Sequence, residues 1–202
     1  MKIPDFLTRH YVKGEDPFLS LNMLPLDRAN QVKRLHDEKY KYGGFYAQDD
    51  YLVHRREIER WMYARFIEKG GRPRMDAPVY MFLGAAEDGC YDYGPESAAL
   101  EIPLSQLDLS AISFVFPDSM YRYIFDEAGV ILRAERTNQP YVYLYDELVA
   151  VMERLYPAIA DYAIRDAGRS QMIEAQVWDR EMCLRYYEKL KASSSKARAK
   201  RL

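Results

Sequence analysis

Residues 108–123 read Asp-Leu-Ser-Ala-Ile-Ser-Phe-Val-Phe-Pro-Asp-Ser-Met-Tyr-Arg-Tyr, and this stretch carries the densest structural signal in the chain. Residues 112–116 have the β-branched and aromatic content, with near-alternation, of a half-buried or central strand. Pro117 cannot donate a main-chain hydrogen bond, and Asp118 and Ser119 can bond their own backbone, so the strand should end in a polar turn. Such a turn is a common place for a ligand, although turn chemistry alone also explains these three residues.

The composition indicates one domain without a membrane segment. The chain has 202 residues, of which 49% are hydrophobic, which is enough for a single core. No apolar run approaches the ~18 residues of a membrane-spanning helix, and the first residues lack the apolar block of a signal peptide, so we expect a cytoplasmic protein. Cys90 and Cys183 lie far apart and form no CxxC motif, which favours reduced thiols over a zinc or redox pair.

The formal net charge of -2 hides a strong asymmetry at the C-terminus. No acidic residue follows Glu188, but six basic residues do: Lys189, Lys191, Lys196, Arg198, Lys200 and Arg201. Without these six, 23 basic and 31 acidic residues give the body a charge of -8, which disfavours a broad nucleic-acid-binding face. We predict a single domain at residues 1–188 and a basic disordered tail at 189–202, the one place where nucleic acid would bind.

The remaining patterns predict an α+β fold. Strands are expected at residues 6–12, 78–84, 98–103, 112–116, 141–145 and 171–178. Helices are expected at residues 25–40 and 51–69, from Asp146 to just before Pro157, at residues 158–167, and after Asp179. Strands and helices do not alternate regularly, so a doubly wound sheet is not favoured. We expect a single domain with a mixed or antiparallel central sheet flanked by helices.

The clearest helix is predicted at residues 51–69. Ile58, Met62 and Phe66 form an apolar stripe with fourfold spacing, and two glycines follow as a C-terminal stop. Charged residues of a helix usually form a solvated face. Four of them are therefore expected to face water or the rim of a groove: Arg55, Arg56, Glu59 and Arg60.

Several catalytic signatures are missing from the sequence. There is no GxGxxG after a strand, no GxxxxGK[ST], no HExxH and no GxSxG, which disfavours common dinucleotide folds, P-loop enzymes, zincins and α/β-hydrolases. His10, His36 and His54 have no second ligand at helical spacing, so no metal site is predicted.

Glu174 is the strongest candidate for chemistry. In the strand predicted at residues 171–178 its carboxylate shares a face with Met172 and Trp178, so it lies at a sheet surface or in a cleft where it must be paired or solvated. A carboxylate in an apolar setting can stabilise developing positive charge or act as a base. The alternative is a cross-strand salt bridge on a solvent-facing side of the sheet.

Two motifs carry resemblances to known families. The segment Gln-Met-Ile-Glu-Ala-Gln-Val-Trp-Asp at residues 171–179, followed by a helix, resembles the ending of small ADP-ribosyltransferase-fold proteins. Residues 108–121 are similar in layout to a strand and turn in DNA-targeting ADP-ribosyltransferase toxins. The whole chain also resembles uncharacterised bacterial proteins that combine Ser-Phe-x-x-Pro-Asp-Ser-Met with Glu-x-Gln-Val-Trp, which suggests a bacterial or phage domain.

The transferase resemblance implies a set of site residues and NAD as the substrate. In that family a glutamate on a late strand orients the nicotinamide ribose of NAD, and the matching residue here is Glu174. Arg9 or His10 on the first strand would hold the NAD phosphate or ribose, and Arg9 is the better phosphate partner because its guanidinium can bind two oxygens. Tyr121 and Tyr123 would stack on nicotinamide or adenine.

Two other functions remain open from the sequence. The 18 tyrosines and eight phenylalanines also suit a non-catalytic protein-binding or accessory domain, of the kind found in immunity proteins, because Tyr is favoured at interfaces. The basic tail would support an accessory role with nucleic acid, which predicts steep salt dependence. No membrane partner is expected.

Overall fold

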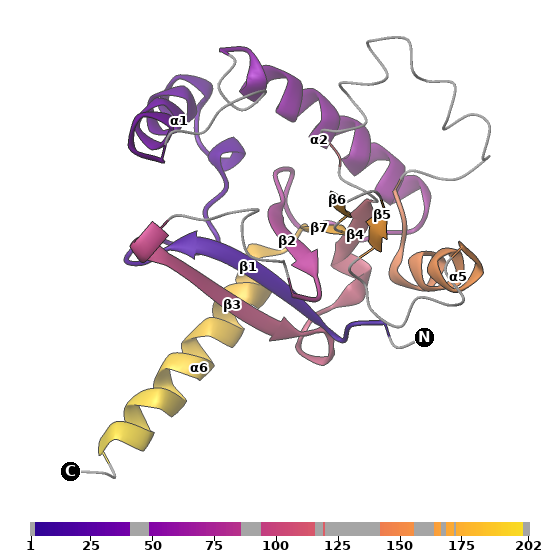
Figure 1. Cartoon of the computed structure of the whole chain (residues 1–202). Helices are drawn as coiled ribbons and strands as arrows, with labels where there is room; N and C mark the ends of the chain where they lie inside the picture. The colour runs from indigo at the N-terminus through magenta and orange to yellow at the C-terminus, as the bar shows by residue number, and fades with distance from the viewer. Residues whose placement is uncertain are drawn as a thin grey trace.

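The protein is built on a five-stranded antiparallel sheet with helices packed on it (Figure 1). The computed structural model describes residues 3–40, 49–85, 94–115, 119, 142–155, 164–166, 169–171 and 173–199. The strands, in their order across the sheet, are β3 (Ser97–Pro103), β1 (Phe6–Val12), β2 (Val79–Leu83), β7 (Glu174–Val177) and β4 (Ile112–Val115). Each neighbouring pair runs antiparallel, which confirms the predicted α+β class.

Helices cover both faces of this sheet. The described α-helices are α1 (Leu26–Tyr40), α2 (Tyr51–Glu68), α5 (Tyr145–Leu155) and α6 (Arg180–Ala199). In Figure 1, α1 and α2 lie above the sheet and α6 lies below it, with its C-terminal part extending away from the body. Short 3-10 turns are η1 (Leu21–Met23), η3 (Gly94–Glu96), η4 (Leu104–Gln106) and η5 (Leu109–Ala111). None of the helices in the described ranges is long and apolar enough to span a membrane.

The strand register divides the core into two parts. Directly paired residues of antiparallel strands point to the same face, so Thr8, Phe82 and Glu174, which pair in sequence across β1, β2 and β7, share one face. That face packs against α2 through Leu52, Met62, Phe66, Val115 and Trp178. The opposite face packs against α5 and α6 through Leu7, Met81, Ile102, Phe114, Ala175, Val177, Leu148, Met152, Met182 and Cys183.

Several local patterns form the expected elements for the expected reasons. Residues 6–12 form β1 with the predicted bounds, and β2 lies within the apolar run at residues 78–84. Gly70 adopts a φ of 91° directly after α2, a conformation that favours glycine, and so ends the helix. Asp179 caps α6, because its Oδ1 accepts a hydrogen bond from the main-chain N–H of Met182 at 3.2 Å.

The strand predicted at residues 141–145 is wrong. Tyr143 forms only an isolated bridge with Phe114, and α5 already begins at Tyr145. The Glu147 carboxylate accepts a hydrogen bond from the main-chain N–H of Leu144 at 2.9 Å, the reciprocal half of a capping box, and thereby sets the helix start. The expected cap, Asp146, lies inside the first turn instead.

The segment before β7 also differs from the sequence prediction. Residues expected in a helix at 158–167 include β5 (Ile164–Asp166), which pairs with β6 (Arg169–Gln171) in a separate two-stranded sheet. Pairing with a neighbouring segment here outweighs a weak helical pattern. The strand expected from residue 171 therefore begins only at Glu174.

The basic C-terminal segment is helical in the structure, whereas the sequence predicted a disordered tail from residue 189. Helix α6 continues through Ala199 without a break at residue 188. Alanine, lysine and arginine are good helix formers, and they outweigh the serine run in this segment. The helix is reinforced locally by an ion pair between Lys191 and Glu188 and by a hydrogen bond from the Ser193 hydroxyl to the Lys189 carbonyl.

Candidate functional site

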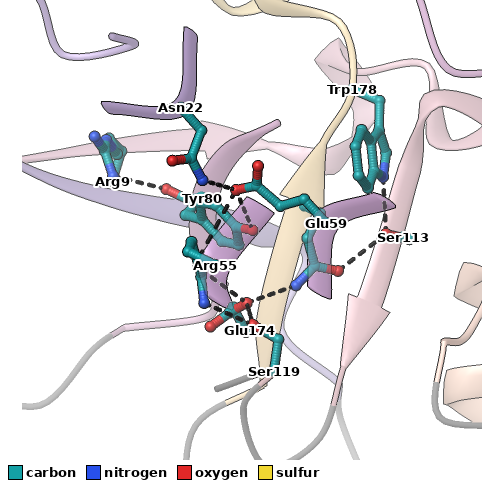
Figure 2. A network of polar contacts seen from close by, with 10 residues as sticks. Arg9, Asn22, Arg55, Glu59, Tyr80, Ser113, Ser119, Glu174 and Trp178 are labelled. Atoms are coloured by element: carbon teal, nitrogen blue, oxygen red, sulfur yellow. Dashed lines mark hydrogen bonds and ion pairs between the residues drawn. The ribbon is translucent and has the colours of Figure 1, made fainter. Parts of the chain in front are cut away.

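A buried network of polar and charged side chains lies between α2 and the sheet (Figure 2). Its members come from η1, α2, β2, β4 and β7 and from the segments that follow β4 and β7. They are Asn22, Arg55, Glu59, Tyr80, Ser113, Ser119, Glu174, Gln176 and Trp178. Buried charges are costly unless they are paired, so a network of this kind calls for a physical account.

Helix α2 places two charges inside the protein. Arg55 and Glu59 are 7% and 2% exposed, so the prediction that they face water or a groove rim is wrong. They continue the buried stripe that Leu52 begins and Met62 extends, with alternating spacings of three and four residues. The stripe points at the sheet, and the partners that the sheet offers allow both charges to be buried there.

Glu174 is the acceptor on which the network converges. Its Oε1 accepts hydrogen bonds from the Ser119 hydroxyl at 2.6 Å and from the Gln176 amide at 2.8 Å. The same oxygen lies 3.5 Å from Nη2 of Arg55. Two hydrogen-bond donors and one guanidinium therefore hold this carboxylate in position. It is 5% exposed and lies inside the protein instead of on a solvent-facing sheet surface.

A chain of hydrogen bonds that begins at Trp178 holds the Gln176 side chain in place. The Trp178 indole N–H donates to the Ser113 hydroxyl at 2.9 Å, and that hydroxyl donates to the Gln176 Oε1 at 2.9 Å. Gln176 then donates its amide to Glu174. The Ser-Phe-x-x-Pro-Asp-Ser-Met and Glu-x-Gln-Val-Trp motifs thus interlock, because both serines of the first motif bond to side chains of the second.

Arg55 connects the two carboxylates. Its Nη1 donates to the Ser119 hydroxyl at 2.9 Å, and its Nε lies 3.8 Å from Oε1 of Glu59. The guanidinium carbon lies 3.7 Å from the centre of the Tyr80 ring, a close cation–π contact. Burial by itself would lower the pKa of Arg55. The pKa nevertheless lies well above its ordinary value because Tyr80, Glu174 and Glu59 favour the charged form.

Glu59 is the second carboxylate of the cluster. Its Oε1 accepts hydrogen bonds from the Asn22 amide at 2.6 Å and from the Tyr80 hydroxyl at 2.7 Å. Burial raises the pKa of Glu59 above its ordinary value; the charge of Arg55 and these hydrogen bonds offset part of the effect, and Glu174 adds to it. Burial likewise raises the pKa of Tyr80, which therefore remains a hydrogen-bond donor.

Among the described side chains, Arg55 lies close to both carboxylates, Glu59 and Glu174. The two carboxylates also act on each other, because the charge of Glu174 contributes to the raised pKa of Glu59. Protonation of Glu59 therefore removes one negative charge from the surroundings of Glu174.

The residues predicted to bind NAD are separated by the sheet. Thr8 shares the face of Glu174, so His10 lies on that face and Arg9 on the other. The Arg9 guanidinium donates to the main-chain carbonyl oxygens of Pro17 at 2.6 Å and Tyr80 at 3.0 Å. The structure thus places His10, but not Arg9, on the side of the candidate carboxylate. Tyr121 and Tyr123 lie outside the described residues.

Sequence reasoning missed most of the network. The sequence predicts a turn residue at Ser119, whereas in the structure its hydroxyl joins Arg55 to Glu174. The spacing of Leu52, Arg55, Glu59 and Met62 on α2 was the signal that could have placed both charges inside. Within the described ranges, no group of three or more His, Cys, Asp or Glu side chains is arranged to hold a metal ion.

Comparisons with protein-family models, curated proteins and solved structures gave no match to this chain.

Proposed function

We propose that the protein is an NAD-using enzyme, of the ADP-ribosyltransferase-like or NAD-glycohydrolase-like kind, with Glu174 as its catalytic carboxylate. The observation that supports this function is the buried cluster in which Arg55 and two hydrogen-bond donors hold Oε1 of Glu174 in place. Replacing a buried ion pair by apolar residues is often neutral or stabilising, so fold stability alone is a weak reason for such a cluster. Preorganised charge is, in contrast, what stabilises a transition state.

A carboxylate held in a fixed position suits the chemistry of this substrate. When the bond between nicotinamide and ribose breaks, the bonding electron pair goes to the nicotinamide nitrogen, and the positive charge moves from the pyridinium ring to the ribose. A fixed carboxylate beside the ribose stabilises that developing cation. Water or an acceptor nucleophile then bonds to the ribose carbon and releases its proton to the solvent.

The test is release of nicotinamide from millimolar NAD by the purified protein and by a Glu174→Gln variant. Glutamine keeps the shape and can still accept from Ser119, but it removes the charge, so release should fall at least about 100-fold. Glu181→Gln, an exposed position on α6, is the matched control and should keep full activity. Absence of release by the unmodified protein, or full release by Glu174→Gln, would refute the proposal.

Glu59 should affect the same reaction through charge. Since protonation of Glu59 removes a negative charge near Glu174, nicotinamide release should fall as the pH drops through the raised pKa of this group. Glu59→Gln is neutral at every pH. That variant should therefore release nicotinamide more slowly at high pH, and its rate should no longer fall as the pH is lowered. If Glu59 had a purely structural role, the shape of the pH–rate profile would be unchanged.

One observation favours the second candidate, a non-catalytic protein-binding domain. The outer side of α2 exposes three large apolar side chains, Val53, Trp61 and Ile67, each more than 40% accessible. A binder of this kind requires neither NAD nor Glu174. In that case NAD would leave the unfolding midpoint unchanged, and Trp61→Gln would weaken partner binding while Glu174→Gln would not.

A further inference from the structure

The second half of helix α6 stands clear of the rest of the domain. It extends away from the sheet and from the other helices (Figure 1). Every residue from Glu188 to Ser193 is exposed, which is more than one full turn, so no side of the helix packs here against the described parts of the chain. The main chain stays helical through Ala199. Residues 188–199 therefore form a helical arm about 18 Å long.

The arm has basic positions on two opposite sides. Lys189 and Lys191 are exposed and lie two residues apart, which places them about 200° apart around the helix axis. Lys196 and Arg198 repeat these two positions after about two further turns. Glu188, at the start of the arm, is the last acidic residue of the sequence. Cationic positions on opposite sides suit a ligand that has an anionic wall on each side of the helix.

The arm offers almost no apolar surface. Leu190 is its one apolar residue larger than alanine, and residues 191–201 contain none. A helix that lies on a membrane buries an apolar face that carries residues such as Leu, Phe or Trp. A helix that docks in a protein groove also uses apolar anchors three or four residues apart. Because the arm lacks both patterns, its charges determine what it can bind.

The charge of the rest of the chain also bears on the partner. Without the six basic residues after Glu188 the formal charge is -8, and such a body repels a polyanion. A polyanion is therefore best contacted by a segment that stands away from the body. Within the arm, Lys191 pairs with Glu188 at 3.2 Å, and both side chains are more than half exposed. An exposed pair of this kind contributes little, so a phosphate can replace Glu188 as the partner of Lys191.

We propose that the arm binds duplex DNA by lying in the major groove, with its basic side chains on the phosphates of both strands. The major groove is about 12 Å wide and admits an α-helix. The residues between the basic positions are mostly alanine and serine, which are small enough for a close approach. Phosphate contacts carry no sequence information, so binding should depend little on base sequence. The proposal does not depend on NAD chemistry at Glu174.

The test is a fluorescence-anisotropy titration of a labelled duplex of about 20 bp with the full chain, without NAD, between about 50 and 200 mM salt. About four phosphate contacts predict a slope of about -4 for the logarithm of the binding constant against that of the salt concentration. A fourfold glutamine variant of the arm should bind at least about 20-fold more weakly, with a slope between about -2 and 0. Glutamine is a good helix former, so the arm should remain helical. The substituted residues are Lys189, Lys191, Lys196 and Arg198.

A matched control makes the same change of charge on the body of the protein. Four exposed arginines of α1 and α2 are replaced by glutamine, and binding should change by less than about twofold. These residues are Arg28, Arg34, Arg60 and Arg65. Equal losses in the two fourfold variants would overturn the proposal, because net charge alone would then explain the binding.

Two further measurements test the helix and the groove. Ser194→Pro keeps every charge but interrupts the helix, so it should weaken binding at least about fivefold. A single strand of the same sequence has no major groove and should also bind at least about fivefold more weakly than the duplex. Unchanged affinity of Ser194→Pro, or equal affinity for the single strand, would overturn the proposal. So would tighter binding of the protein to phosphatidylserine vesicles than to the duplex, since the ligand would then be a membrane surface.

Discussion

The two faces of the central sheet are stabilised in different ways. Toward α6 the sheet presents an apolar surface, to which β7 contributes Ala175 and Val177. Toward α2 the same strand presents Glu174 and Gln176, which belong to a buried polar network. A four-residue strand therefore serves both faces, because alternate side chains of a strand point in opposite directions. The comparison is therefore between an apolar interface and a buried polar one within the same sheet.

The difference lies in how the two faces respond to the loss of one partner. An apolar contact that is removed leaves a cavity, and the surroundings relax in part. A buried charge that loses its partner is left in a medium that solvates it poorly, and few neighbours can compensate. The α2 face should therefore be the more sensitive of the two to single substitutions.

The largest effect is expected from Arg55→Met. It leaves the carboxylates of Glu59 and Glu174 buried without their guanidinium, so the free energy of unfolding should fall by about 3–5 kcal/mol. Chemical denaturation of both proteins measures this difference. If Arg55→Met does not fold, Arg55→Lys is measured in its place. Lysine keeps the positive charge, so the free energy of unfolding should fall by less.

The matched control for this substitution is Arg65→Met on the outer side of the same helix. Arg65 forms an exposed ion pair with Glu68, so its loss should cost less than about 1 kcal/mol. Equal losses at the two positions would mean that the buried cluster is no more sensitive than the surface, which contradicts the contrast between the faces. A variant with Arg55→Met, Glu59→Gln and Glu174→Gln should regain much of the stability lost in Arg55→Met.

The sequence was sufficient to predict the alternation of β7. The sequence predicts Glu174 and Trp178 on one face, and both belong to the polar network on the α2 side, whereas Ala175 and Val177 lie in the core on the α6 side. The bounds of β1 and of most of α2 also follow from local patterns, because apolar periodicity and glycine stops act over a few residues.

The partners of the charged residues could not be predicted in the same way. The sequence predicts Arg55 and Glu59 on a water-facing side because charged residues are seldom buried without partners. Their partners, Tyr80, Ser119 and Glu174, are supplied by distant parts of the chain. Likewise, Arg9 lies on the other face of the sheet from Glu174 because of the register across three strands. No local sequence pattern predicts that register.

A smaller effect is expected from Ser113→Ala, at the far end of the network. The substitution removes the acceptor of the buried Trp178 N–H and the hydroxyl that supports Gln176, which should lower the free energy of unfolding by about 1–3 kcal/mol. Ser193→Ala on the exposed side of α6 should change it by less than about 0.5 kcal/mol. A loss at Ser113 no larger than at Ser193 would show that the chain of hydrogen bonds does not contribute.

A gradual effect is expected from pH at Glu59. Its pKa is raised in the folded protein, so the folded state holds the proton more tightly than the unfolded state does. This contribution to stability is fully present below the unfolded pKa and is lost as the pH rises through the folded pKa. The difference in unfolding free energy, unmodified protein minus Glu59→Gln, should therefore fall with rising pH. Denaturation at several pH values tests this, and a flat or rising difference contradicts it.

On the apolar face itself no effect on stability is expected, and the test there uses Cys183, a titratable group buried in that face. Burial raises the pKa of this thiol to about 12, and its side chain is inaccessible. Because only the thiolate is alkylated, the higher pKa alone should slow reaction with iodoacetamide at pH 8 by about a thousandfold relative to an ordinary thiol. Mass spectrometry should find Cys183 unmodified in the native protein and modified in denaturant. Rapid native labelling would mean that the α6 face opens readily, and the apolar face would then be the weaker of the two.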